Sequence, residues 1–203
     1  MNRKDFLVRS GVFTGAAMWA PSLMATPMQP AGADIQPVLL PPLPPLEHGG
    51  SMGIRTRIYS TMTNGVYSSV ECAVAPKNMG PPPHMHKELD ELMFVTEGTA
   101  HVLIGNDVVK VEAGGWHLRP RMMKHTFWNA GEQDLRFIDM YFHQPFEKYL
   151  EKIFFDLNEA NGFPEGSEAK MNAINQLNDE FGVLFGDDSW SERQRIVAEF
   201  KLK

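Results

Sequence analysis

The sequence lacks the disulfide-forming cysteines, the basic excess and the long apolar runs that mark several classes of protein. Its single cysteine, Cys72, excludes an internal disulfide and lies in a strand-like run, which predicts a small buried residue. A net charge of −6 argues against nucleic acid or an anionic membrane as the partner. Beyond the N-terminus, no apolar run approaches the roughly 18 residues of a spanning helix. We therefore expect a globular chain with no membrane attachment in its mature form.

The N-terminal segment has the features of an export signal. Arg3 and Lys4 supply positive charge, "GVFTGAAMWA" is a short apolar stretch, and "AGA" at residues 31–33 has the small-x-small pattern of a cleavage site. "NRKDFLVRS" resembles a twin-arginine signal in which Lys4 replaces the second arginine. The alternative is an amphipathic N-terminal helix. We predict a signal peptide over residues 1–33 and a periplasmic or extracellular protein.

Three regions follow the signal. Residues 34–52 form a proline-rich arm, with five prolines from Pro37 to Pro45 that favour an extended chain. Residues 53–144 contain short runs of β-branched and aromatic residues separated by Gly, Asn or Pro, which predicts an all-β antiparallel sandwich or barrel. In residues 145–203 the apolar residues recur at helical spacing. We expect this helical extension to pack outside the barrel or against a partner subunit; nothing in the sequence supports a lid over the barrel mouth.

The stretch "HMHKELDE" concentrates two histidines and three acids within eight residues. His84 and His86 are two residues apart, so on a strand both imidazoles point to the same face and can reach one ion. Local spacing does not choose among the three carboxylates of Glu88, Asp90 and Glu91. A further histidine from a distant strand would complete a metal site, and the candidates downstream in the β region are His101, His117 and His125.

Two longer segments resemble the motifs of the cupin superfamily. "GPPPHMHKELDELMFVTEG" is similar to the first cupin motif, with its HxH, Glu and closing Gly, and "GGWHLRPRMMKHTFWN" is similar to the second. The resemblance implies a single cupin barrel, which is a double-stranded β-helix or jelly roll, with C-terminal α-helices. Met122 departs from the second motif, which commonly has glycine there, and this departure concerns the shape of a turn.

The resemblance also implies a ligand set. Carried over residue by residue, the metal ligands fall on His84, His86, Glu91 and His125, and Glu88 and Asp90 become the turn between them. Three imidazoles and one carboxylate suit one divalent transition metal, either Fe, Mn, Ni, Co, Cu or Zn. Calcium and magnesium prefer sites made only of oxygen ligands. Four protein ligands would leave one or two positions open for a substrate or dioxygen.

Strand alternation indicates which side chains share the interior with the ligands. Phe127 is two residues from His125, and Met93 and Val95 are two and four residues from Glu91, so each should point to the same side of its strand as the ligand. We therefore predict these three residues in the substrate pocket. His117 is expected either behind the ligands or in the pocket. His101 is expected to be a half-exposed strand residue. Arg119 and Arg121 stay open as further residues facing the site.

The segment "FEKYLEKI" after the barrel resembles the small quercetinase-like cupins. This implies a metal-dependent dioxygenase that acts on a small aromatic or enol-like substrate, with Glu91 as the catalytic residue that accepts the substrate proton. The alternatives are a redox-neutral isomerase, lyase or hydrolase, and a non-catalytic cupin that binds a small molecule through its metal. Cupins are often dimers, so a homodimer that exchanges the proline-rich arm is a further expectation.

Overall fold

A computed structural model describes residues 35–203 of the chain. The predicted signal peptide lies outside the described residues. Most of the described chain up to Phe142 is β-structure, and most of the remainder is helical. The strands are β1 Met52–Ile58, β2 Tyr67–Val74, β3 Asn78–Met79, β4 Met85–His86, β5 Asp90–Glu97, β6 Thr99–Ile104, β7 Asp107–Glu112, β8 Trp116–Arg119, β9 His125–Asn129, β10 Leu135–Phe142 and β11 Val183–Leu184.

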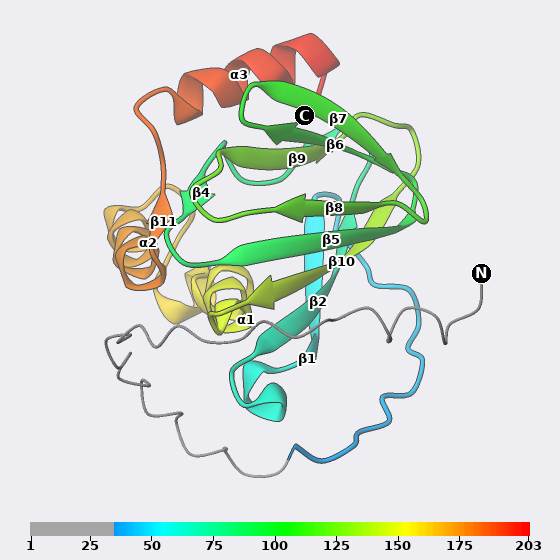
Figure 1. Ribbon diagram of the computed structural model, residues 1–203. Coiled ribbons are helices and arrows are strands. Elements are labelled where there is room, and N and C mark those ends of the chain that lie inside the picture. Colours follow the sequence, from blue (N-terminus) through cyan, green and yellow to red (C-terminus); the bar gives the residue numbers. More distant parts are fainter. Residues whose placement is uncertain (1–34) are drawn as a thin grey trace, which may run out of the picture. The chain divides into compact units, whose positions relative to one another are not determined.

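Two antiparallel sheets build the barrel (Figure 1). The order of the first sheet is β1-β2-β10-β5-β8 and that of the second is β3-β9-β6-β7, while β11 pairs only with β4. Side chains alternate in burial along the strands, so that on β10 Leu135 and Phe137 are buried and Arg136 and Ile138 are partly exposed. The inward residues of both sheets form one apolar core, in which Met93, Val95 and Phe127 take part.

The helical region contains α1 Phe146–Glu151, the π-helix η2 Lys152–Asp156, η3 Glu159–Asn161, α2 Glu168–Phe181 and α3 Ser189–Phe200; a short 3-10 helix, η1 Ser60–Thr63, joins β1 to β2. Helix α2 begins where Ser167 caps it, with its Oγ accepting a hydrogen bond from the Lys170 amide at 3.2 Å. Among residues 35–203, no helix is both long and apolar enough to cross a membrane.

The helices of the extension have two different positions. Helix α3 covers the outer face of the four-stranded sheet, where Ile196 packs with Leu103 and Trp128 (Figure 1). In contrast, α1 and η2 pack their apolar stripe against the core of the barrel and line its cavity together with Phe127. The expectation that the extension packs only on the outside is therefore wrong for α1 and η2. The apolar stripe of these helices packs at the open end of the barrel because burying apolar surface there is favourable.

The proline-rich arm runs without regular structure from Ile35 and is tied to the five-stranded sheet of its own chain. Arg57 donates to the carbonyl oxygen of Pro41 at 2.7 Å, and Arg55 donates to that of Pro44 at 3.1 Å. Proline-rich backbone has unpaired carbonyl groups, so guanidinium donors from β1 are suitable partners. Exchange of the arm between two subunits stays a prediction.

Candidate metal centre

The two histidine-bearing motifs meet through backbone hydrogen bonds. The amide of His84 donates to the carbonyl oxygen of His125 at 3.0 Å, and the amide of His125 donates to that of His84 at 2.8 Å. His86 follows on β4, and Glu91 lies near the start of β5. Residues 41 positions apart in the sequence are thus direct neighbours, and their side chains point into the same end of the barrel.

The side chains of His84, His86, Glu91 and His125 converge. Their candidate ligand atoms all lie within 4.8 Å of one another, and all four residues are buried. His84 and His125 are also oriented from behind, since each Nδ1 lies 2.9 Å from a backbone carbonyl oxygen, of Pro82 and Met123 respectively. A carbonyl oxygen only accepts, so Nδ1 carries the proton and Nε2 has the free lone pair that a metal requires.

Several buried atoms of this cluster have no hydrogen bond among the described residues. They include Nε2 of His86 and Nε2 of His125. Oxygens of Glu91 lie 2.9 Å from the first and 3.3 Å from the second, but these approaches do not have hydrogen-bond geometry. Buried polar atoms normally have partners. These nitrogen and oxygen atoms converge without forming hydrogen bonds to one another, as expected for ligands that share one divalent metal ion.

The electrostatics favour the protonation states that a metal needs. Burial, followed by His125 and His86, holds the pKa of His84 well below its ordinary value of 6.5. Burial alone would raise the pKa of Glu91, but Arg119 above all, with His125 and His86, holds it well below its ordinary value. Neutral imidazole and ionised carboxylate are the forms that bind metal ions.

The structure separates the three acids of "HMHKELDE". Glu88 is exposed and outside the cluster. Asp90 is bound by Arg121, whose Nε donates to Oδ1 at 3.0 Å and whose Nη2 donates to Oδ2 at 2.6 Å. The side chain of Arg121 lowers the pKa of Asp90 to about 2. Of the three acids, Glu91 is the one that joins the histidines.

Arg119 is the residue of this site that the sequence left undecided. It pairs with Glu91 across β8 and β5, is 1% exposed, and places Nη2 3.1 Å from Oε2 of Glu91. The same Nη2 donates to Oδ1 of Asp139, whose Oδ2 accepts from the hydroxyl of Tyr141 at 3.3 Å. A sequence signal existed, because Arg119 has the parity of an inward position on its strand, and buried arginines need partners.

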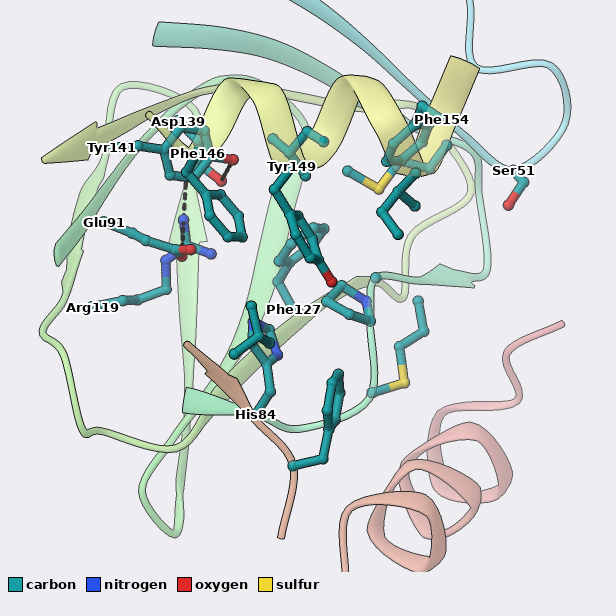
Figure 2. A pocket seen from close by; sticks show the side chains of 18 residues that line it. Ser51, His84, Glu91, Arg119, Phe127, Asp139, Tyr141, Phe146, Tyr149 and Phe154 are labelled. Atoms are coloured by element: carbon teal, nitrogen blue, oxygen red, sulfur yellow. Dashed lines mark hydrogen bonds and ion pairs between the residues drawn. The ribbon is translucent and has the colours of Figure 1, made fainter. Parts of the chain in front are cut away.

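A cavity of about 310 Å³ adjoins the cluster (Figure 2). Its polar end is formed by His84, Glu91, Arg119, Asp139 and Tyr141. The rest of its wall is mainly apolar and comes from the barrel rim and from the C-terminal extension. The apolar and aromatic residues that line it are Met52, Met79, Pro81, Phe127, Phe146, Tyr149, Leu150, Ile153, Phe154, Val183 and Phe185.

The predicted pocket residues have different positions. Phe127 lines the cavity. Met93 and Val95 are fully buried in the core and do not reach the cavity wall. His117 borders a separate, more open depression beside β7. His101 is buried rather than half-exposed, because the extension adds Phe200 against it, with ring centroids 5.5 Å apart.

Comparison with known proteins identifies the β-region. A family model described as a cupin domain matches residues 70–141. No match was found among curated protein sequences. Among solved structures, the chain is similar to KdgF from Halomonas sp., at 16% identity and a TM-score of 0.43 over 48% of this chain and 84% of that one.

Two further solved structures have comparable similarity. One is a Cupin 2 conserved barrel domain protein from Salinispora arenicola CNS-205, with 17% identity, a TM-score of 0.44, and coverage of 53% of this chain and 90% of that one. The other is the polyketide cyclase RemF from Streptomyces resistomycificus, with 23% identity, a TM-score of 0.42, and coverage of 46% and 66%.

Proposed function

From the premise that this chain has a mostly β cupin fold with C-terminal helices, we propose that it is a metal-dependent enzyme of dioxygenase type. The proposed substrate is a small aromatic or enol-like molecule. The observation that carries the proposal is the position of His84 and Glu91, which belong both to the metal cluster and to the wall of an otherwise mainly apolar cavity. A molecule in that cavity would contact the place where the ion is held.

His84, His86, Glu91 and His125 would hold the ion. A divalent transition metal bound there would supply Lewis-acid chemistry, and dioxygen chemistry if it is redox-active. The cavity volume of about 310 Å³ is at the lower end of the range for small-molecule sites. Its aromatic wall would exclude water and bind a planar apolar body.

The polar end of the cavity would orient the substrate head. Burial, followed by Asp139, holds the pKa of Tyr141 well above its ordinary value, so this residue stays a neutral phenol. Glu91 is the proposed acceptor of the substrate proton, because it is the one carboxylate shared by the cluster and the cavity wall. The pKa of Glu91, held well below its ordinary value above all by Arg119, keeps it deprotonated but makes it a weak base, so the transfer would need a substrate proton made acidic by the ion.

The test combines elemental analysis with oxygen uptake. The native protein should contain about one transition-metal ion per chain. Protein loaded with Fe or Mn should then consume dioxygen with at least one member of a panel of flavonols, catechols and diketones, and Glu91→Gln should abolish that uptake. Metal binding without oxygen uptake on any substrate would contradict the dioxygenase proposal.

The same panel separates the alternatives that the resemblance left open. Turnover that persists without oxygen, or with zinc in the site, would indicate a redox-neutral isomerase, lyase or hydrolase. Metal-dependent binding of a panel member without any turnover would indicate a binding cupin. The proposed export and homodimer are tested separately, by sequencing the N-terminus of the mature protein and by measuring its mass in solution.

A further inference from the structure

We propose that Arg119 is a positioning residue, anchored by Asp139, that occupies Oε2 of Glu91 so that Glu91 ligates the ion through Oε1 alone. One coordination position is thereby kept open toward the cavity. This inference rests on the proposed metal site, but not on the reaction proposed for it. It assigns a role to a buried charge that is not among the four ligands the resemblance implies.

The first support is the burial of the charges. Arg119 is 1% exposed and Asp139 is 2% exposed, and they lie on β8 and β10, the two strands that flank β5. Burying a guanidinium is costly unless its charge is balanced and its donors are used. Two carboxylates, from Glu91 and Asp139, lie within reach of a single Nη2 atom, and both contacts use that atom. The group is therefore aimed at the metal cluster rather than at the cavity alone.

The second support is the difference between the two contacts. The hydrogen bond of Nη2 to Asp139 is the shorter, and the approach to Oε2 of Glu91 is 3.1 Å. Asp139 is itself fixed from its other oxygen by the hydroxyl of Tyr141 at 3.3 Å. Arg119 thus has a second anchor, Asp139, besides Glu91.

The third support is the pair of environments around the Glu91 carboxylate. Oε1 lies 2.9 Å from Nε2 of His86, whereas Oε2 is shared between Nη2 of Arg119 at 3.1 Å and Nε2 of His125 at 3.3 Å, so Arg119 competes with the ion for Oε2. A carboxylate can bind a metal through one oxygen or through both, and an ion-pair partner on the second oxygen favours the first mode. Ligation through both oxygens would fill a position that a substrate or water needs.

The competing explanation is that Arg119 and Asp139 form a buried ion pair with a purely structural role. That explanation predicts altered stability and an unaltered metal environment. The number of water molecules on a bound ion separates the two explanations, because it responds to the mode of Glu91 ligation and not to the stability of the fold.

The experiment uses the full chain loaded with Mn²⁺ and measures water-proton relaxation. In Asp139→Asn the amide oxygen can still accept from Arg119, so the relaxivity should equal that of the wild type. In the double variant Arg119→Met with Asp139→Asn, both charges are gone, and exchange of a buried ion pair for neutral groups is often tolerated. In this double variant, Oε2 of Glu91 no longer has Arg119 beside it and should bind the ion in place of a water molecule. The relaxivity should therefore fall by the contribution of about one bound water.

Each outcome decides the proposal. Unchanged relaxivity in the double variant, with Mn²⁺ bound at the wild-type ratio, overturns it, and so does loss of Mn²⁺ from a folded double variant. Should the double variant not fold, Arg119→Lys is measured. The shorter lysine should stay with Asp139 and release Glu91, so the relaxivity should again fall, and no change overturns the proposal. A wild type that binds no Mn²⁺ would refute the metal site as well.

Discussion

The polar end and the apolar wall of the cavity come from different parts of the chain. The polar end uses side chains of the barrel strands, at spacings of two to five residues or in direct register across a sheet. Most of the apolar wall beyond the barrel rim comes from α1, η2 and the segment around β11, all outside the matched residues 70–141.

The two ends of the cavity place different demands on the sequence. The metal ligands need particular residue types, because few side chains supply atoms that bind a metal ion, and imidazole and carboxylate groups are among them. The wall needs only apolar volume of the right shape, which many sequences can provide. We infer that the barrel strands determine what the site can do to a molecule, and the extension determines which molecules enter.

Phe146 tests whether the extension and the barrel form one unit. Its ring is 4% exposed and contacts His86, with centroids 4.9 Å apart, and Tyr141 at 5.1 Å. Phe146→Ala should lower the free energy of unfolding by about 3–5 kcal/mol, through lost burial and a residual cavity. Urea denaturation measures this. The control Phe155→Ala, at a residue 52% exposed, should change it by less than about 0.5 kcal/mol. Equal effects would contradict the proposed docking.

His125 tests the polar end. Loss of a group that supports a metal ligand commonly costs about 10–100-fold in affinity, so His125→Ala should weaken metal binding by more than about 100-fold. Titration with a competing chelator measures the affinity. The control Glu88→Ala removes a carboxylate that is exposed and outside the cluster, so it should leave the affinity unchanged. A comparable loss in both variants would mean that the cluster is not the site.

Gly80 tests the boundary between the two ends. A Cβ at this position would lie 2.8 Å from Cζ of Phe127, which lines the cavity. Gly80→Ala should displace that ring, destabilise the fold by about 1–3 kcal/mol, and leave the metal content unchanged. Fluorescence titration with a flavonol should show binding weakened by about 10-fold or more. Unchanged flavonol affinity would indicate that the molecule binds elsewhere.

The pH dependence of stability tests the buried histidines. The pKa of His84 lies well below 6.5 because of burial, then His125 and His86. Below about pH 6.5 the unfolded chain therefore binds a proton that the folded chain does not, and stability is lost as the pH falls. The free energy of unfolding of metal-free protein should drop by up to about 1.4 kcal/mol per pH unit for this histidine. Urea denaturation at pH values from about 6.5 down to 5.5 measures it, and His84→Gln should have a shallower slope.

Met122 has the smallest expected effect. Its φ of 58° lies in the left-handed region, at the position where the second motif commonly has glycine. This conformation costs a non-glycine residue roughly 1–2 kcal/mol, which the greater chain entropy of unfolded glycine partly offsets. Met122→Gly should raise the free energy of unfolding by up to about 1 kcal/mol in thermal or urea denaturation. Met123→Gly, where φ is not positive, should give no gain.

Much of the polar end could be predicted because its determinants are local. The two-residue alternation of a strand places His84 and His86 on one face, and the resemblance to the cupin motifs selects Glu91 and His125. The same alternation put Phe127 in the cavity. It misled for Met93 and Val95, because an inward residue of a barrel can face the core instead of the cavity. Arg119 stayed undecided because its partners, Glu91 and Asp139, lie on two other strands.

By itself, the sequence indicated a β-region followed by a helical extension, because both have a characteristic periodicity, and its resemblance to the cupin motifs implied the four ligand candidates. The tertiary structure decided that α1 and η2 line the cavity while α3 packs on the outer face of a sheet, although all three have an apolar stripe. It also decided that the buried Arg119 is shared by Glu91 and Asp139. The placement of the helices and the pairing of Arg119 both depend on contacts between segments that are distant in the sequence. An apolar stripe can pack on any apolar surface, and a buried charge can pair with any opposite charge within reach, so neither specifies its partner in the sequence.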